Sequence, residues 1–283
     1  MAVTATDVKK LRDKTGAGMM DCKKALNEAD GDFAAAEKKL KEMGLAAAKK
    51  RMGRATNEGR VFTYIGSNAA GILEFSCETD FVARNQDFVD LGNELIQQFV
   101  EEGTSPDDEA VQTKVRDAIS TIKENMAIRR HEILDVAENE VVVDYIHGDS
   151  GHLGVLVKVS VDNPELRDSE PVRRFASDMA LHVAAYNPSF LSQQTVPQRY
   201  QEEQESIFRK QAESLGKPEK VLENIIQGKM KKHYAEVCLL EQPFVKDDKK
   251  SVNQQAEAVG KELGATVQVS DYRYYRVGEE LES

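Results

Sequence analysis

The sequence lacks long hydrophobic runs. None of its 283 residues belongs to a stretch of roughly 18 to 20 consecutive apolar side chains, the length needed to span a bilayer. The N-terminus also lacks the apolar core of a signal peptide. With 40% hydrophobic and 31% charged residues, the composition is that of a globular protein, and we expect a cytoplasmic location with no membrane contact.

Cysteine is scarce as well. Cys22, Cys77 and Cys238 are odd in number and far apart in the sequence. A disulfide framework and a C-x-x-C metal knuckle are therefore excluded. We expect three reduced thiols buried as small apolar side chains.

The common motifs of nucleotide binding and hydrolysis are missing. There is no G-x-x-x-x-G-K-[ST], no G-x-G-x-x-G, no G-x-S-x-G and no H-E-x-x-H. The glycine turn at Thr15–Gly18 joins two predicted helices, so it does not resemble a phosphate cradle. His147 and His152 flank Asp149 across a turn, but no cysteine or further histidine lies nearby. We predict no catalytic residue, no metal and no cofactor, and a protein that binds rather than catalyses.

Basic residues outnumber acidic residues in the N-terminal part of the chain but are outnumbered by them in the rest. Residues 1–60 hold 14 Lys and Arg against 9 Asp and Glu, whereas the rest of the chain holds 24 against 40. A basic head on an acidic body argues against general nucleic-acid binding, although the head could touch an acidic surface. We expect no direct contact with nucleic acid.

The first 45 residues are predicted to form a small domain of three short helices. Thr4 and Asp7 resemble a capping box, and Asp32 is placed to cap the third helix. Residues 46–58, rich in Ala, Lys and Arg, are expected to be a linker. In the second helix, two neighbouring methionines, Met19 and Met20, cannot share one helix face. At least one should lie outside the core, where methionine suits adaptable protein contacts, unless both fold into the small core.

From residue 59 the pattern changes to strands, and it occurs twice. A hairpin followed by a helix is predicted in residues 59–140 and again in residues 141–283. Similar segments recur in the two halves at offsets of 81 and 83 residues: Tyr64-Ile65 with Tyr145-Ile146, and Gly71-Ile72-Leu73 with Gly154-Val155-Leu156. We infer an internal duplication.

Further elements complete the expected α+β fold. Gly71–Cys77 alternates like a half-buried strand, and residues 128–136 read as a third strand of the first sheet. Residues 236–240 and 266–269 are expected to complete the second sheet, with a helix at 252–263 between them. Two charged helical stretches within about 190–234 predict an antiparallel hairpin that projects from the second half.

The most informative stretch is Cys77–Asn85, where a predicted strand ends and a predicted helix begins. It places Asp80 beside Phe81 in a loop, and loops on a rigid scaffold often carry function. From spacing alone, the ordinary interpretation is that Asp80 caps the helix and Phe81 packs beneath it.

Several segments together resemble the family of bacterial elongation factor Ts. The first signature is Leu11-Arg12-x-x-Thr15-Gly16-Ala17-Gly18-Met19-Met20-Asp21-Cys22-Lys23-Lys24-Ala25-Leu26, and the second is Glu78-Thr79-Asp80-Phe81-Val82-Ala83. Shorter matches follow across nearly the whole chain: Asn125–Arg130, His147-Gly148, His182–Ala185 and Gln242–Val245. The family's architecture of a three-helix domain resembling ubiquitin-associated folds, a duplicated core and a projecting hairpin agrees with the pattern above.

The resemblance implies a guanine nucleotide exchange factor that binds elongation factor Tu, both GDP-bound and nucleotide-free. In the family, the segment matching Thr79, Asp80, Phe81 and Val82 enters the partner near its Mg²⁺ site, with the aromatic ring wedged between partner side chains. This implies an exposed Phe81. Other positions that contact the partner in the family match residues across the chain, namely Arg12, Met19, Met20, Lys23 and His147. A homodimer through the hairpin or the core is a further expectation.

Two other functions remain open at this point. The three-helix domain could serve a helical adaptor that binds peptides without any effect on GDP. A hydrolase using His147, Asp149 and His152 is the second alternative, for which the sequence offers no nucleophile.

Overall fold

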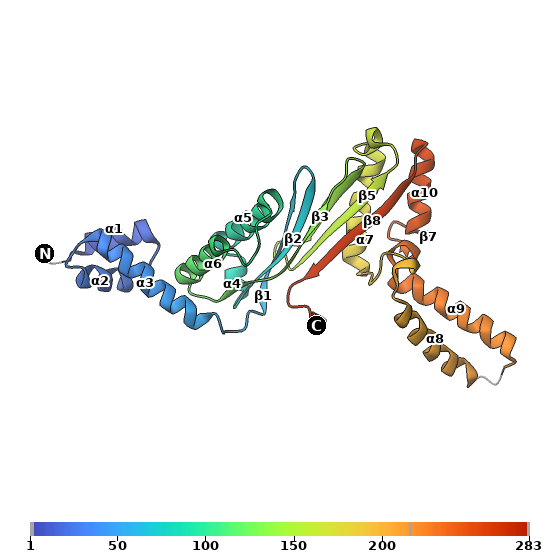
Figure 1. Ribbon diagram of the computed structural model, residues 1–283, viewed down its shortest axis with the longest axis horizontal. Coiled ribbons are helices and arrows are strands. Elements are labelled where there is room, and N and C mark those ends of the chain that lie inside the picture. The colour runs from blue at the N-terminus through green and yellow to red at the C-terminus, as the bar shows by residue number, and fades with distance from the viewer. Residues whose placement is uncertain (1–2, 215–216, 282–283) are drawn as a thin grey trace. The chain divides into compact units, whose positions relative to one another are not determined.

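The protein is described by a computed structural model that covers residues 3–214 and 217–281 (Figure 1). It combines many helices with small sheets, which confirms the predicted α+β class. The chain divides into two compact units. The first unit comprises residues 1–62, 73–132 and 276–283, and the second comprises residues 63–72 and 133–275.

The N-terminal helices are α1 (Ala5–Thr15), α2 (Met19–Glu28) and α3 (Phe33–Arg51). Thr4 and Asp7 form the predicted capping box of α1, and the Asp32 carboxylate accepts the Ala35 N–H at the start of α3. Their small core consists of buried apolar side chains from all three helices: Val8, Leu11, Cys22, Ala25, Leu26, Ala36 and Leu40. Helix α3 is 19 residues long and runs past residue 45, where the sequence placed the end of this domain.

The first sheet has the order β1-β2-β3, with β1 (Glu58–Ile65), β2 (Ala69–Cys77) and β3 (Met126–Asp135). Strands β1 and β2 form the predicted hairpin, closed by the Gly66 N–H bonded to the Ala69 carbonyl at 2.8 Å. The third predicted strand of this sheet is confirmed. Between β2 and β3 lie α4 (Asp80–Ala83), α5 (Gln86–Glu102) and α6 (Glu109–Ile122).

Helix α5 packs on β2 through aromatic side chains. Phe75 of β2 stacks on Phe88 of α5 with ring centroids 4.7 Å apart and planes 12° apart. Phe62 of β1 lies 6.2 Å from Phe88, and a Cβ at Gly92 would come within 2.3 Å of the Phe62 ring. Gly92 therefore lets helix and strand approach closely.

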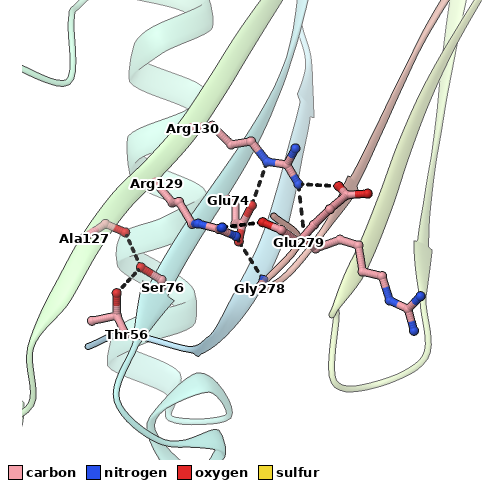
Figure 2. Close-up of polar contacts among 9 residues, drawn as sticks. Thr56, Glu74, Ser76, Ala127, Arg129, Arg130, Gly278 and Glu279 are labelled. Atoms are coloured by element: carbon pink, nitrogen blue, oxygen red, sulfur yellow. Dashed lines mark hydrogen bonds and ion pairs between the residues drawn. The ribbon is translucent and has the colours of Figure 1, made fainter. Parts of the chain in front are cut away.

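Strand β2 is buried on both faces, so the prediction of a half-buried strand is wrong. Glu74 and Ser76, which the alternation placed toward water, are 0% and 1% exposed. Figure 2 shows the reason, since these side chains are covered by polar partners within the first unit. The Ser76 hydroxyl lies 2.9 Å from the Thr56 hydroxyl and 3.1 Å from the Ala127 carbonyl oxygen.

The carboxylate of Glu74 is the centre of this buried polar cluster. Arg129 and Arg130 of β3 each place a guanidinium nitrogen 2.7 Å from it. The N–H of Gly278, in the C-terminal segment, donates to the same carboxylate at 3.0 Å, and Glu279 pairs with Arg130 at 3.0 Å. Segment 276–279 is thus tied to the first unit by ionic hydrogen bonds (Figure 2).

The second sheet has the order β4-β5-β8, with β4 (Glu140–His147), β5 (Leu153–Val161) and β8 (Val267–Arg276). Strands β4 and β5 are antiparallel, with Val143 opposite Val157. Helices α7 (Glu170–Tyr186) and α10 (Val252–Leu263) contribute to the core beneath this sheet. A repeated three-stranded sheet beginning with a hairpin agrees with the inferred duplication.

The expectation that residues 236–240 complete this sheet is wrong. Helix α9 (Glu219–Val237) continues into the segment, and a short 3₁₀ helix, η3 (Leu239–Glu241), follows. Only Cys238 forms an isolated bridge, with Phe190. The Val-Cys-Leu-Leu run is apolar because it packs in the core, which a helix end satisfies as well as a strand does.

The remaining elements lie in the second unit. Helices α8 (Gln198–Glu213) and α9 form the predicted hairpin, whose turn at residues 215–216 lies outside the described residues. Its seam includes the buried side chains Ala212, Leu222 and Ile226. A small sheet of β6 (Pro243–Phe244) and β7 (Asp247–Ser251) and the 3₁₀ helices η1 (Pro164–Leu166) and η2 (Gln193–Thr195) had no counterpart in the prediction.

All three cysteines are free and buried, as predicted. Within the described ranges, no helix combines the length and the apolar character that crossing a membrane requires.

Candidate functional site

The segment singled out in the sequence folds as the single helical turn α4 between β2 and α5 (Figure 1). Its cap is Thr79, whose hydroxyl oxygen accepts the Val82 N–H at 3.3 Å. The following helix, α5, is capped by Asn85. Asp80 caps neither helix and instead pairs with Arg84 at 3.3 Å, with 44% of the Asp80 side chain and 66% of the Arg84 side chain exposed. The capping role proposed for Asp80 is therefore wrong.

Phe81 is 82% exposed, the most exposed of the large apolar side chains of the described chain. Its neighbours Val82 and Ala83 are 8% and 1% exposed and anchor the turn to the body of the first unit. The expectation that Phe81 packs beneath the helix is wrong, and the exposure implied by the family resemblance is confirmed. A phenyl ring in water costs free energy that the fold alone does not explain.

Thr79 is held by every polar group it has. Its N–H and its hydroxyl donate to the two carboxylate oxygens of Glu124, at 3.0 Å and 2.8 Å. Its carbonyl oxygen accepts the Ala83 N–H at 3.2 Å and the Cys77 thiol at 3.2 Å. The backbone that leads into α4 is therefore fixed before any partner arrives.

Glu124 is held in turn by its neighbours. Lys123 ends α6 in the left-handed conformation, with φ of 71°. Asn125, 4% exposed, donates its backbone N–H to Glu78 at 2.7 Å and its side-chain amide to the Arg54 carbonyl at 2.7 Å. Asn125, the residue after Glu124, is therefore tied to the first unit by two hydrogen bonds.

Cys77 lies directly before this segment. Burial, and secondarily the negative charge of Glu124, raise the pKa of its thiol to about 12. The thiol therefore stays protonated at neutral pH, so it is a hydrogen-bond donor and not a nucleophile.

The candidate contact residues of the helical domain are all exposed. Arg12 lies on α1, and Met19, Met20 and Lys23 lie on the first turns of α2. Met19 is 46% and Met20 is 75% exposed, so the alternative that both pack in the core is wrong. Gly18 precedes them as the N-cap without a side-chain cap.

His147 is the last residue of β4, in the second unit. It is exposed, and its Nδ1 lies 2.8 Å from the hydroxyl of Tyr145, with the two rings 5.9 Å apart. In residues 3–214 and 217–281, no group of three or more His, Cys, Asp or Glu side chains is arranged to hold a metal ion.

His182 is fully buried. Its Nδ1 accepts the Val245 N–H at 3.2 Å, and its Nε2 lies 2.9 Å from the Gln242 side-chain oxygen. The ring is therefore neutral with the proton on Nε2. Burial lowers its pKa below the usual value.

The structure joins four of the predicted site residues, Thr79 to Val82, in one turn, and places the others on α1, α2 and β4. Sequence reasoning missed Glu124, which contacts Thr79 from 45 positions away. No local pattern marks such a contact, because only the fold brings the end of α6 to the end of β2.

Comparisons with known proteins agree on one family. The family model described as Elongation factor TS matches residues 78–279. Elongation factor Ts of Borrelia recurrentis (strain A1) is 49% identical over 278 residues, which cover 98% of this chain and 100% of the relative.

Two further relatives carry the same name. Elongation factor Ts of Borreliella burgdorferi (strain ATCC 35210) is 46% identical over 276 residues, covering 98% of this chain and 99% of the relative. That of Treponema denticola (strain ATCC 35405) is 42% identical over 278 residues, with the same coverage. The chain therefore belongs to the elongation factor Ts family.

Proposed function

We propose that this protein is a guanine nucleotide exchange factor that binds elongation factor Tu and promotes GDP release by disturbing the partner's Mg²⁺ and phosphate site. Membership of the family supports the broader role in translation elongation. The finer proposal rests on one observation above all, the 82% exposed Phe81 on a turn whose backbone is fixed.

The chemistry needed is a binding equilibrium and no covalent step, so we do not propose an enzyme. Mg²⁺ demands near-ideal octahedral geometry and bridges protein and phosphates in nucleotide sites. A side chain that displaces the surroundings of the ion therefore weakens GDP binding. By linkage, a factor that binds nucleotide-free Tu more tightly than Tu·GDP must weaken GDP by the same ratio.

Phe81 has the properties that such a wedge requires. Aromatic side chains contribute large apolar area at low cost in side-chain entropy and often dominate interfaces. Asp80 lies beside it on the exposed turn, while Thr79 and Val82 hold the turn from within. In this proposal Asp80 and Phe81 reach the partner, and Thr79 and Val82 fix the geometry.

A second set of contacts is proposed for the helical domain and for β4. Met20 is 75% exposed at the start of α2, and flexible thioether side chains adapt to a partner's surface. Arg12, Met19 and Lys23 share this domain, and His147 adds a contact from the second unit. These residues supply affinity, whereas Phe81 supplies the effect on GDP.

The test is GDP release from elongation factor Tu loaded with a fluorescent GDP and chased with excess unlabelled GDP in a stopped-flow instrument. The wild-type protein should accelerate release, and Phe81→Ala should reduce that acceleration about tenfold or more. Because Phe81 is exposed, the thermal unfolding midpoint of the Phe81→Ala variant should match that of the wild type. Met52→Ala, which removes a half-exposed apolar side chain outside α4, is the matched control and should behave like the wild type.

Two outcomes would contradict the proposal. Undiminished acceleration by Phe81→Ala would exclude the wedge. Binding to Tu by the wild-type protein without any change in GDP release would instead favour the helical adaptor. The homodimer through the hairpin or the core stays a prediction.

A further inference from the structure

We propose that Glu124 is a positioning residue for nucleotide exchange, because its carboxylate fixes Thr79 and thereby the direction in which α4 presents Phe81. The inference rests on the proposed exchange function. It assigns a role to a residue that lies 43 positions beyond Phe81 in the sequence and does not belong to the projecting turn.

The geometry gives Glu124 control over the cap of α4. Both of its carboxylate oxygens accept hydrogen bonds from Thr79, one from the N–H at 3.0 Å and one from the hydroxyl at 2.8 Å. The hydroxyl proton therefore points at Glu124, which leaves the oxygen lone pairs free to accept the Val82 N–H at 3.3 Å. Glu124 thus fixes the orientation in which Thr79 caps the helix.

Helix α4 depends on this support because it is very short. It has four residues, Asp80–Ala83, and a single turn has too few internal hydrogen bonds to be stable by itself. Its stability comes from the cap and from the burial of Val82 and Ala83. Hydrogen bonds to a carboxylate are about twice as strong as neutral ones, so the two Glu124 contacts restrain the segment more than its neutral hydrogen bonds do.

The residues around Glu124 are themselves held in place by hydrogen bonds and an ion pair. Asn125 is bonded to Glu78 and to the Arg54 carbonyl, and Glu78 also pairs with Arg54 at 3.3 Å. The residues around Glu124 are therefore tied to the segment before β1 and to the end of β2. An exposed ring on a turn held this way loses little freedom on binding, which is how preorganisation raises affinity.

The experiment uses the full-length protein and the fluorescent GDP release assay on elongation factor Tu. Glu124→Ala should reduce the maximal acceleration about tenfold, and Thr79→Val should do the same. Glu124→Gln keeps one acceptor oxygen and should fall between Glu124→Ala and the wild type. Thr79→Ser keeps the hydroxyl and should stay within about twofold of the wild type. Glu102→Ala removes an exposed glutamate at the end of α5 and is the matched control.

A double-mutant cycle separates positioning from a merely structural effect. If Glu124 acts through the turn, Glu124→Ala should change the release rate less than twofold when Phe81 is already alanine. A general loss of folded protein would instead reduce the rate by the same factor in both backgrounds. Circular dichroism and thermal unfolding of each variant measure the folded fraction independently.

The outcomes distinguish the two proposals. Loss of acceleration in Phe81→Ala with none in Glu124→Ala would overturn the positioning role and leave the exchange function standing. A full additive effect of Glu124→Ala in the Phe81→Ala background would overturn it as well. Undiminished acceleration by Phe81→Ala would overturn the wedge itself, whatever Glu124→Ala does.

Discussion

His182 shows how a single buried residue couples the fold to pH. Both ring nitrogens are engaged, Nδ1 as an acceptor from the Val245 N–H and Nε2 toward the Gln242 oxygen. Tyr186 and Phe244 stack on the ring, at 4.7 Å and 6.5 Å between centroids. A second proton on Nδ1 would face the Val245 N–H, a donor, in a place from which water is excluded.

The consequence is a loss of stability in acid. Burial lowers the pKa of His182 in the folded state. In the unfolded chain this histidine has its ordinary pKa of about 6.5, so below that pH the unfolded state binds more protons than the folded state does. Stability is complete above that pH and falls as the pH decreases below it, by up to about 1.4 kcal/mol per pH unit for this group. The free energy of unfolding, measured with urea at several pH values between 7.5 and 5, should depend less steeply on pH for His182→Gln than for the wild type.

A second histidine provides the comparison. Burial also lowers the pKa of His131, which lies 5.2 Å from the Phe99 ring. In the His131→Gln variant, the pH dependence of the unfolding free energy should lose the contribution of His131 and retain that of His182. Equal slopes in the wild type and His182→Gln would show that the His182 ring does not titrate differently on unfolding.

At the residue scale, sequence reasoning succeeded where local chemistry decides the outcome. The Thr4 capping box, the Asp32 cap and the exclusion of at least one of Met19 and Met20 from the core depend on neighbours a few positions away. The exposure of Phe81 did not follow from spacing, because a spaced aromatic normally packs inward. It came from the family resemblance. Glu124 was missed because its partner is distant in sequence.

At the scale of an element, β2 is stabilised by an ionic cluster as well as by apolar packing. Glu74 has no exposure, and the guanidinium groups of Arg129 and Arg130 lie 2.7 Å from it, with 27% and 18% of those side chains exposed. Three charged groups removed from water are favourable only while they remain paired. The strand is therefore sensitive to the loss of one member.

Glu74→Gln should destabilise the protein by about 3 kcal/mol, because Arg129 and Arg130 would lose the buried anion that they share, and Glu279 would still pair with Arg130. The change is nearly isosteric, so lost packing does not explain the effect. Glu94→Gln is the matched control, since Glu94 is 56% exposed and pairs with Lys114 at 2.5 Å. An exposed pair of this kind contributes less than about 1 kcal/mol. Denaturant unfolding with equal midpoints for the two variants would contradict the prediction.

The element scale is also where the sequence predictions failed most. An alternating pattern placed Glu74 and Ser76 in water, yet long-range partners cover them, and alternation cannot report a second covering layer. Residues 236–240 are as apolar as a strand, but they end α9 and enter η3. In contrast, α10 has the predicted bounds, Val252–Leu263, and the structure shows Ser251 capping its start and Gly264 ending it in the left-handed conformation.

At the scale of the whole molecule, the duplication was visible because similar segments recur at nearly constant offsets, and two three-stranded sheets agree with it. The division into compact units was not predicted. The boundaries between the two units fall after residues 62, 72, 132 and 275, which lie inside strands or near their ends. A hairpin is one local element in sequence, so no composition change marks a boundary within it. Residues 63–72 group with the second unit, where Thr63 bonds Asp144 at 2.6 Å.

The C-terminal segment is also divided between the two units within a strand. Strand β8 belongs to the second unit up to Tyr275, and the residues after it belong to the first. There the Gly278 N–H donates to Glu74, and Glu279 supplies its carboxylate to Arg130 at 3.0 Å and its carbonyl oxygen to Arg129. The segment therefore contributes to the buried cluster from the far end of the chain.

A chain ending at Tyr275 should lose about 2 to 4 kcal/mol of stability, less than the sum of about 1.5 to 3 kcal/mol for each hydrogen bond to a charged group, because water replaces part of the lost contacts. The loss should appear as a lower denaturant midpoint, because the cluster around Glu74 would keep its two arginines but open to water. A chain ending at Glu280 keeps Gly278 and Glu279 and is the control, with a midpoint close to that of the full chain. If both truncated chains unfolded at the midpoint of the full chain, the C-terminal contacts would carry no stability. If both were destabilised equally, the residues after Glu280 would be responsible instead of the cluster.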